Sequence, residues 1–176
     1  MFQTIAMLCC GTLVQFLMVS AVLSEEPKSA ISQKFAGTWS LQSFTATLPD
    51  GKIVYPFGED AMGRIVYDTQ GRMMVQLLRR NRPAFASGDL SAGTPEEIAA
   101  AFSGSLCYYG RYRVDEKEGT VTHILEACTF PNWVGTSQVR LFTFKNDILT
   151  LKTSPIQLSS VGKAPTPMVL VWKKEK

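Results

Sequence analysis

The stretch CYYGRYRVDEKEGTVTHILEAC, residues 107–128, predicts a β-hairpin and decides the fold class. Two alternating runs flank the turn sequence EKEG at 116–119. Antiparallel pairing around that turn places Tyr112 opposite His123 and Cys107 opposite Cys128. One face of the hairpin is largely apolar and the other largely polar, which is typical of strands that cover a core on one side.

Similar hairpin patterns run through most of the chain. Turn signals separate the alternating runs. These runs cover residues 37–58 with a turn at 49–51, 63–80 with a turn at 68–71, 136–154 with its tip at 146–147, and a last strand at 167–174. These segments predict an all-β chain of about eight or nine strands in an antiparallel barrel or sandwich. One helix is expected at 94–104, where Thr94 begins a capping box, and a short helical turn at 29–37.

Composition predicts one ordinary globular domain without a nucleic-acid partner. The chain has 176 residues, 45% of them hydrophobic and 19% charged, with a formal net charge of +3. Acidic and basic residues are interspersed except for a short LLRRNR run. The concentrated basic stripe of a nucleic-acid-binding protein is therefore missing.

Residues 1–24 contain no charged side chain and precede the polar sequence EEPKS. This pattern predicts a signal peptide, a polar arm at 25–36, a barrel domain at 37–176, and a secreted or periplasmic protein. An uncleaved membrane anchor is the alternative, and only that alternative gives the chain a membrane partner. Export into an oxidising compartment leaves Cys107 and Cys128 as a pair, and we expect a disulfide between them.

The single histidine, His123, lies in a predicted strand and is expected to point inward with Tyr108 and Tyr112. A buried histidine is most often a structural group that is hydrogen-bonded to a tyrosine or a carbonyl. Two further strands place polar side chains among apolar ones, Arg140 with Phe142 and Phe144, and Gln76 with Met74. The alternative for residue 140 puts Val139 and Leu141 inward and Arg140 in solvent.

An apolar barrel with inward Gln76, Tyr108, Tyr112, His123 and Arg140 would have the composition of a small-molecule site. The loop at 81–93, rich in Gly, Ser and Pro, is a candidate lid or a plain surface connection. The sequence predicts no metal and no cofactor, because metal-ligand spacing and a phosphate-binding loop are both missing.

The sequence also resembles a known family. Gly37-Thr38-Trp39 is similar to the Gly-X-Trp signature of lipocalins, and the segments 50–68, 71–89, 94–144 and 170–174 follow in order. Residues 35–173 resemble the lipocalin-like domain family of bacteria and fungi. The resemblance implies a small antiparallel barrel with a central cavity, closed at one end by Trp39. It also implies cavity or rim positions at Tyr108, Tyr112, His123, Asn132 and Arg140, with Gly110 and Gly135 serving backbone geometry.

Three functions remain open at this point. The leading hypothesis is an exported carrier or sensor that binds a small apolar or amphipathic ligand whose acidic or carbonyl group faces Arg140 and His123. The second is an isomerase or cyclase with His123, Tyr108 and Tyr112 as catalytic groups. The third is a structural barrel with a filled interior. The ligand-binding candidates are Trp39, Met74, Gln76, Tyr108, Tyr112, His123, Asn132 and Arg140.

Overall fold

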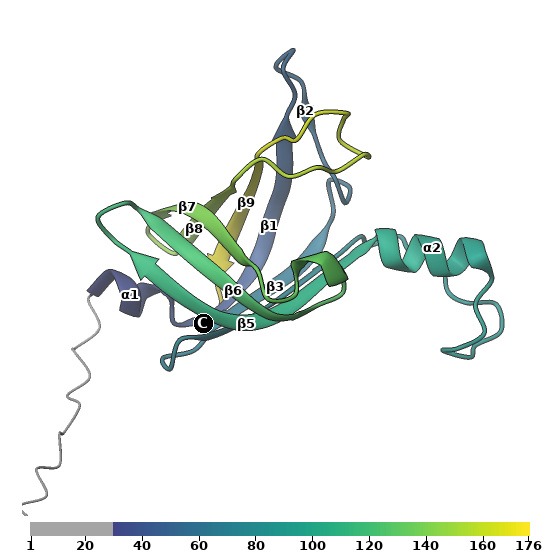
Figure 1. The fold of residues 1–176 in the computed structure, drawn as a ribbon, viewed down its shortest axis with the longest axis horizontal. Coiled ribbons are helices and arrows are strands. Elements are labelled where there is room, and N and C mark those ends of the chain that lie inside the picture. The colour runs from purple at the N-terminus through teal and green to yellow at the C-terminus, as the bar shows by residue number, and fades with distance from the viewer. Residues whose placement is uncertain (1–29) are drawn as a thin grey trace, which may run out of the picture.

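Nine strands follow one another along residues 30–176, the part of the chain that the computed structural model describes (Figure 1). The predicted signal peptide at 1–24 lies outside these residues. The strands are β1 (Gly37–Thr47), β2 (Ile53–Val54), β3 (Met62–Tyr67), β4 (Arg72–Leu78), β5 (Ser105–Asp115), β6 (Thr120–Cys128), β7 (Ser137–Lys145), β8 (Ile148–Thr153) and β9 (Met168–Lys174).

The sheet closes on itself because β1 pairs with β9 as well as with β3. Eight antiparallel strands therefore form a barrel, and the two-residue β2 extends one end of β1. Every barrel strand pairs with its neighbour in the chain, so short turns suffice to connect most of them. The predicted antiparallel barrel is confirmed. Of the predicted turn tips, Gly71 and Asn146 both adopt the positive φ that tight turns require.

Alternation along β4 differs from the sequence-based prediction. Met73, Val75 and Leu77 are buried, whereas Met74 and Gln76 are exposed. The prediction that Met74 and Gln76 face the barrel interior is wrong. Pairing with β3 sets the orientation, because Val75 lies opposite the buried Ile65 and so shares its face. Since both faces of β4 carry apolar side chains, its own alternation did not determine which face was inward.

A β-bulge interrupts the pairing of β5 with β6. Tyr112 lies opposite His123 and Gly110 opposite Leu125, both as predicted, but Tyr109 lies opposite Ala127 because one extra residue is inserted in β6. Gly110 is required here, since a Cβ atom on this residue would lie 2.0 Å from the carbonyl oxygen of Ile124. This close approach of two backbones explains a glycine in the middle of a long strand.

The bulge also separates the two cysteines. Cys128 lies opposite Tyr108, and Cys107 lies opposite the outward-facing Gln76, so the predicted direct pairing of the cysteines is wrong. Both thiols are free in the structure. Cys128 packs against the core, which Cys107 does not.

A short helix, α1 (Ala30–Phe35), closes one end of the barrel (Figure 1). Phe35 is fully buried, and its ring centroid lies 5.2 Å from that of Tyr67 and 5.0 Å from those of Phe142 and Phe144. The indole nitrogen of Trp39 donates a hydrogen bond of 2.8 Å to the carbonyl of Phe35. This aromatic plug leaves the opposite end as the route into the barrel.

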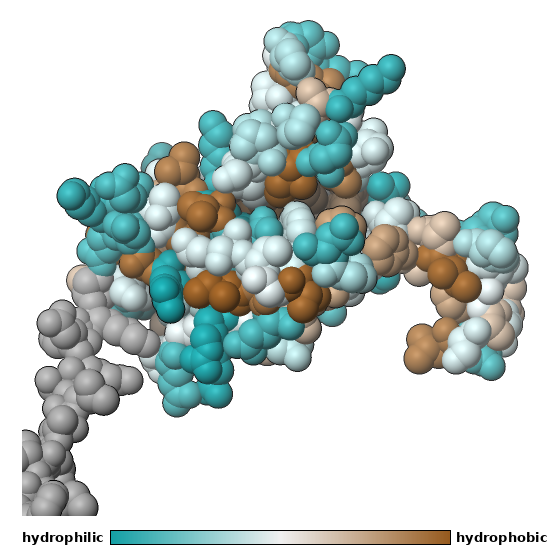
Figure 2. Space-filling view, viewed as in Figure 1, coloured by the Kyte–Doolittle hydropathy of each residue, from teal (hydrophilic) through white to brown (hydrophobic). Residues whose placement is uncertain are grey.

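The second helix, α2 (Pro95–Ser103), projects away from the barrel together with the loop at 81–93 (Figure 1). Its predicted capping box is present, with Thr94 and Glu97 exchanging hydrogen bonds. Apolar side chains show on this projection in Figure 2, and Leu90, Ile98 and Phe102 are exposed. Within residues 30–176, no helix is long and apolar enough to cross a membrane.

Candidate ligand-binding site

His123 is fully buried between two tyrosines from different strands. The hydroxyl of Tyr67, on β3, lies 2.8 Å from its Nε2 atom, and the hydroxyl of Tyr108, on β5, lies 3.2 Å from its Nδ1 atom. Both ring nitrogens therefore have partners, as burial of a polar side chain demands. The predicted inward orientation is confirmed.

Burial holds the pKa of His123 well below its ordinary value of 6.5, and the nearby Arg140 guanidinium lowers it further. The imidazole is thus neutral at physiological pH. Burial also raises the pKa of Tyr67 well above its ordinary value, and raises that of Tyr108. Both hydroxyls therefore keep their hydrogens, so one tyrosine donates to the imidazole and the other accepts from it.

Arg140 is the buried cation of the barrel, at 5% exposure, and its predicted inward orientation is confirmed. Its Nη1 donates to the Gln138 carbonyl at 2.7 Å, and its Nη2 donates to the Tyr108 hydroxyl at 3.3 Å. The guanidinium carbon lies 6.0 Å from the centroid of the Tyr108 ring. No carboxylate among the described residues pairs with Arg140, although four exposed ion pairs form elsewhere on the same part of the chain. An unpaired buried guanidinium is costly unless a ligand or a polar network completes its contacts.

A cavity of about 40 Å³ lies inside the barrel against Arg140 and Tyr108. Its remaining wall is mainly apolar and comes from most of the strands, with Phe44, Ile65, Val75, Leu77, Leu106, Trp133, Leu151, Thr153, Ile156, Met168, Leu170 and Trp172. None of these lining residues is acidic. The cavity as it stands has room for water but not for a drug-sized ligand, which requires about 300 Å³ or more.

His123 is not among the residues that line this cavity. Its ring contacts Tyr108 and Tyr67, so it meets the cavity only through the Tyr108 hydroxyl. A general acid or base must reach the reacting atom directly or through one water. His123 is therefore placed to orient the Tyr108 hydroxyl and not to contact a molecule in the cavity.

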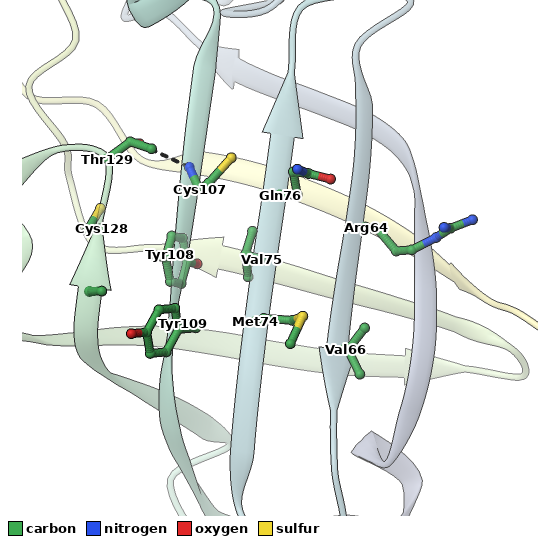
Figure 3. Close-up of a pocket in the computed structure, with 11 residues that line it drawn as sticks. Arg64, Val66, Met74, Val75, Gln76, Cys107, Tyr108, Tyr109, Cys128 and Thr129 are labelled. Atoms are coloured by element: carbon green, nitrogen blue, oxygen red, sulfur yellow. Dashed lines mark hydrogen bonds between the residues drawn. The ribbon is translucent and has the colours of Figure 1, made fainter.

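A larger groove of about 510 Å³ lies on the outer face of β3, β4 and β5, and Figure 3 shows its lining. Met74 and Gln76, which were predicted to lie inside the barrel, line this groove together with Tyr109 and the two cysteines. The one arginine in its lining, Arg64, already pairs with Glu175 at 2.9 Å. The groove thus has no buried charge in need of a partner, and the smaller interior cavity is the better candidate site.

Three other predicted site residues lie away from the interior cavity. Trp39 packs with Phe35 in the aromatic plug, and the Tyr112 hydroxyl donates to the Asp68 carbonyl at 2.8 Å rather than to His123. Asn132 is exposed in the short 3₁₀ helix η1 (Pro131–Trp133). Its neighbour Trp133, which was not predicted, contributes to the cavity wall.

Tyr67 is the main residue that sequence analysis did not identify. It follows the buried Ile65 by two residues on β3, so the strand pattern places both side chains on the inward face. Its contact with His123 depends on the curvature that brings β3 across the barrel to β6, which no local pattern specifies. Among the described residues, no group of three or more His, Cys, Asp or Glu side chains could hold a metal ion.

Comparison with known proteins identifies the barrel. A family model described as "Lipocalin-like domain" matches residues 36–175. The chain belongs to this lipocalin-like domain family. A curated relative, the 4'-hydroxy-3'-methoxypropiophenone carrier protein ppsC of Aspergillus oryzae, is 34% identical over 109 residues, covering 58% of this chain and 96% of the relative.

A solved structure, a mutant of the fluorescent protein UnaG, covers 81% of this chain and 96% of its own, with 12% identity and a TM-score of 0.36. The family match and the closed antiparallel sheet, and not this likeness, identify the lipocalin-like barrel.

Proposed function

We propose that this lipocalin-like protein is a carrier that holds a small, largely apolar molecule inside the barrel, with a carbonyl or acidic oxygen against Arg140 and Tyr108. The unpaired buried guanidinium carries the proposal, because it lines an otherwise apolar cavity and lacks an anionic partner among the described residues. The carrier role named for the Aspergillus oryzae relative supports it, and suggests a phenolic aryl ketone as the ligand class.

The hydrogen-bond order around His123 suits this role. If Tyr67 donates to Nε2, then Nδ1 donates to the Tyr108 oxygen, which also accepts from Arg140. The Tyr108 hydroxyl hydrogen is then free to donate into the cavity. The reverse order would leave the Tyr67 hydroxyl hydrogen buried in the core and away from the cavity, at the cost of an unsatisfied donor.

Ligand entry requires the barrel to open wider than it stands. The connection at 154–167 between β8 and β9 contributes Ile156 to the cavity wall, and an isolated bridge between Ile156 and Thr166 joins its two ends. Loops of this kind move more readily than the strands that they connect. We propose this connection as the moving part, in place of the loop at 81–93, which does not line the cavity.

Titration calorimetry with 4'-hydroxy-3'-methoxypropiophenone tests the carrier proposal. We expect the unmodified protein to bind this probe and Arg140→Met to weaken binding by about 1.5–3 kcal/mol, the worth of a hydrogen bond to a charged group. Arg113→Met, on the exposed face of β5, is the matched control and should leave affinity unchanged. Equal affinity of the Arg140→Met variant and the unmodified protein would reject the site.

We also propose that the chain is exported and cleaved after Ser24. The uncharged run at 1–24 followed by EEPKS supports this proposal. Intact mass of the protein recovered from its own host tests it. A mass that includes residues 1–24 would reject cleavage and favour the membrane-anchor alternative.

A further inference from the structure

Trp172, on β9, carries a buried donor that has no partner. Its side chain is 1% exposed and lines the interior cavity, and its Nε1 atom has no hydrogen-bond partner in the structure. The other fully buried indole in the described chain, that of Trp39, donates to the Phe35 carbonyl. Of these two fully buried indoles, only that of Trp172, which lines the cavity, lacks a partner.

A buried N–H without an acceptor costs about 1–3 kcal/mol, and such groups are rare in native proteins. A phenylalanine on β9 would keep an aromatic ring in the core and carry no N–H that needs an acceptor. A ligand oxygen that accepts from the indole would remove the penalty whenever the site is occupied. A hydrogen bond to a ligand would therefore explain why the unpartnered Nε1–H belongs to a residue of the cavity wall.

We propose that Trp172 is the second anchor of the ligand, and that its Nε1–H donates to an oxygen at the end of the molecule away from Arg140. This inference rests on the proposed carrier function and specifies the ligand further. It requires an acceptor oxygen at each end of an apolar middle.

Strand pairing separates the two anchors along the barrel. Arg140 lies opposite Thr153 on β8, whereas Trp172 lies opposite Leu149 on the same strand. Four residues of strand correspond to roughly 13 Å. The two donors therefore lie at different positions along the barrel, and both residues line the same cavity, whose wall includes Leu151 and Leu170.

The polar groups of the cavity wall favour ligand atoms that accept hydrogen bonds over ligand atoms that donate them. Arg140, Tyr108 and Trp172 all offer N–H or O–H groups, and the Thr153 oxygen already accepts from the Met168 amide at 2.9 Å. The lining includes no carboxylate. A phenolic aryl ketone, with a carbonyl on one side of a ring and ring oxygens on the other, satisfies both anchors.

Two probes and two variants test the inference by calorimetry. One probe is 4'-hydroxy-3'-methoxypropiophenone, and the other is propiophenone, which keeps the ketone but lacks the ring oxygens. We expect Trp172→Phe to weaken binding of the first probe roughly three- to tenfold, as loss of one neutral hydrogen bond implies, and to leave propiophenone affinity unchanged. Arg140→Met should weaken both probes, because both carry the ketone.

The outcomes separate the two proposals. Equal loss for both probes in Trp172→Phe would show a packing effect and overturn the anchor, while the carrier function stands. No loss for either probe would overturn it as well, with water as the partner of the indole. If the unmodified protein binds neither probe, the carrier function fails for this ligand class, and the anchor fails with it.

Discussion

The hydroxyl oxygen of Tyr67 lies 2.8 Å from Nε2 of His123, in a part of the barrel where neither residue is more than 1% exposed. On the other side of the imidazole, Tyr108 continues the chain of hydrogen bonds to Arg140. Hydrogen bonds within a buried network of this kind are stronger than in water and make the core more rigid. Side chains from three strands, β3, β5 and β6, thus form the hydrogen-bonded group around one neutral histidine.

The neutral state of His123 predicts acid sensitivity. Its pKa is lowered on folding, so the unfolded chain binds a proton near pH 6.5 that the folded chain does not. Stability is therefore present above pH 6.5 and is lost as pH falls below it, by up to about 1.4 kcal/mol per pH unit. Urea unfolding at pH 7.5, 6.0 and 5.0 measures this slope.

The matched variant for the pH slope is His123→Gln. It keeps polar atoms in the site but cannot titrate, so its stability should be almost level between pH 7.5 and 5.0, although lower overall. His123 is the only histidine in the chain, and the acids with lowered pKa, Asp68, Glu97 and Glu175, titrate at lower pH. An unchanged slope in the variant would contradict the assignment.

Removing the Tyr67 hydroxyl should destabilise the barrel. Tyr67→Phe leaves Nε2 of His123 without its partner in a site closed to water, which costs about 1–3 kcal/mol. The control is Tyr109→Phe, on the exposed face of β5, which should change stability by less than about 0.5 kcal/mol. Chemical denaturation of both variants at pH 7.5 compares them, and equal stabilities would refute the role of the Tyr67 contact.

Sequence patterns predicted the barrel well, because alternation and turn residues are local properties. The hairpin of β5 and β6 keeps the register that its turn sets as far as Gly110. The inward face of β7 was predicted from the phenylalanines that share a face with Arg140. Prediction failed on β4, where both faces carry apolar residues. There only the pairing with β3 fixes which side chains enter the core.

The candidate site was predicted only in part, because some of its residues come together through local register and others through closure of the barrel. His123, Tyr108 and Arg140 lie on adjacent or nearly adjacent strands, so local register brings them together. Tyr67 and Trp172 reach the same interior from β3 and β9, and closure of the whole barrel determines their place. Contacts across a barrel depend on its curvature, which alternation along single strands does not encode.

Gly110 should tolerate no side chain. In Gly110→Ala the new Cβ would meet the Ile124 carbonyl oxygen at 2.0 Å, and that neighbour is backbone that cannot rotate away. We expect a loss of stability of about 3 kcal/mol or more, beyond the range of ordinary overpacking. Gly88→Ala, in the loop at 81–93, is the control for the loss of a glycine at a site with open space, although its positive φ adds some strain. Thermal unfolding of the two variants compares them, and a smaller loss in Gly110→Ala than in Gly88→Ala would refute the close approach.

The two cysteines should remain free thiols in the folded protein, whatever compartment it reaches. The bulge at Gly110 sets Cys128 opposite Tyr108, and Thr129 rather than Cys128 donates its amide to the Cys107 carbonyl at 2.8 Å. A disulfide needs its two Cβ atoms about 3.5–4.5 Å apart and directed toward one another. Since Cys128 packs on the core and Cys107 lies beside the exposed Gln76, a bridge would require the strands to slip by one residue. Alkylation followed by intact mass, with and without prior reduction, should count two modified thiols among residues 30–176 in both samples. Modification only after reduction would mean that β5 and β6 pair in the register that places the cysteines opposite each other.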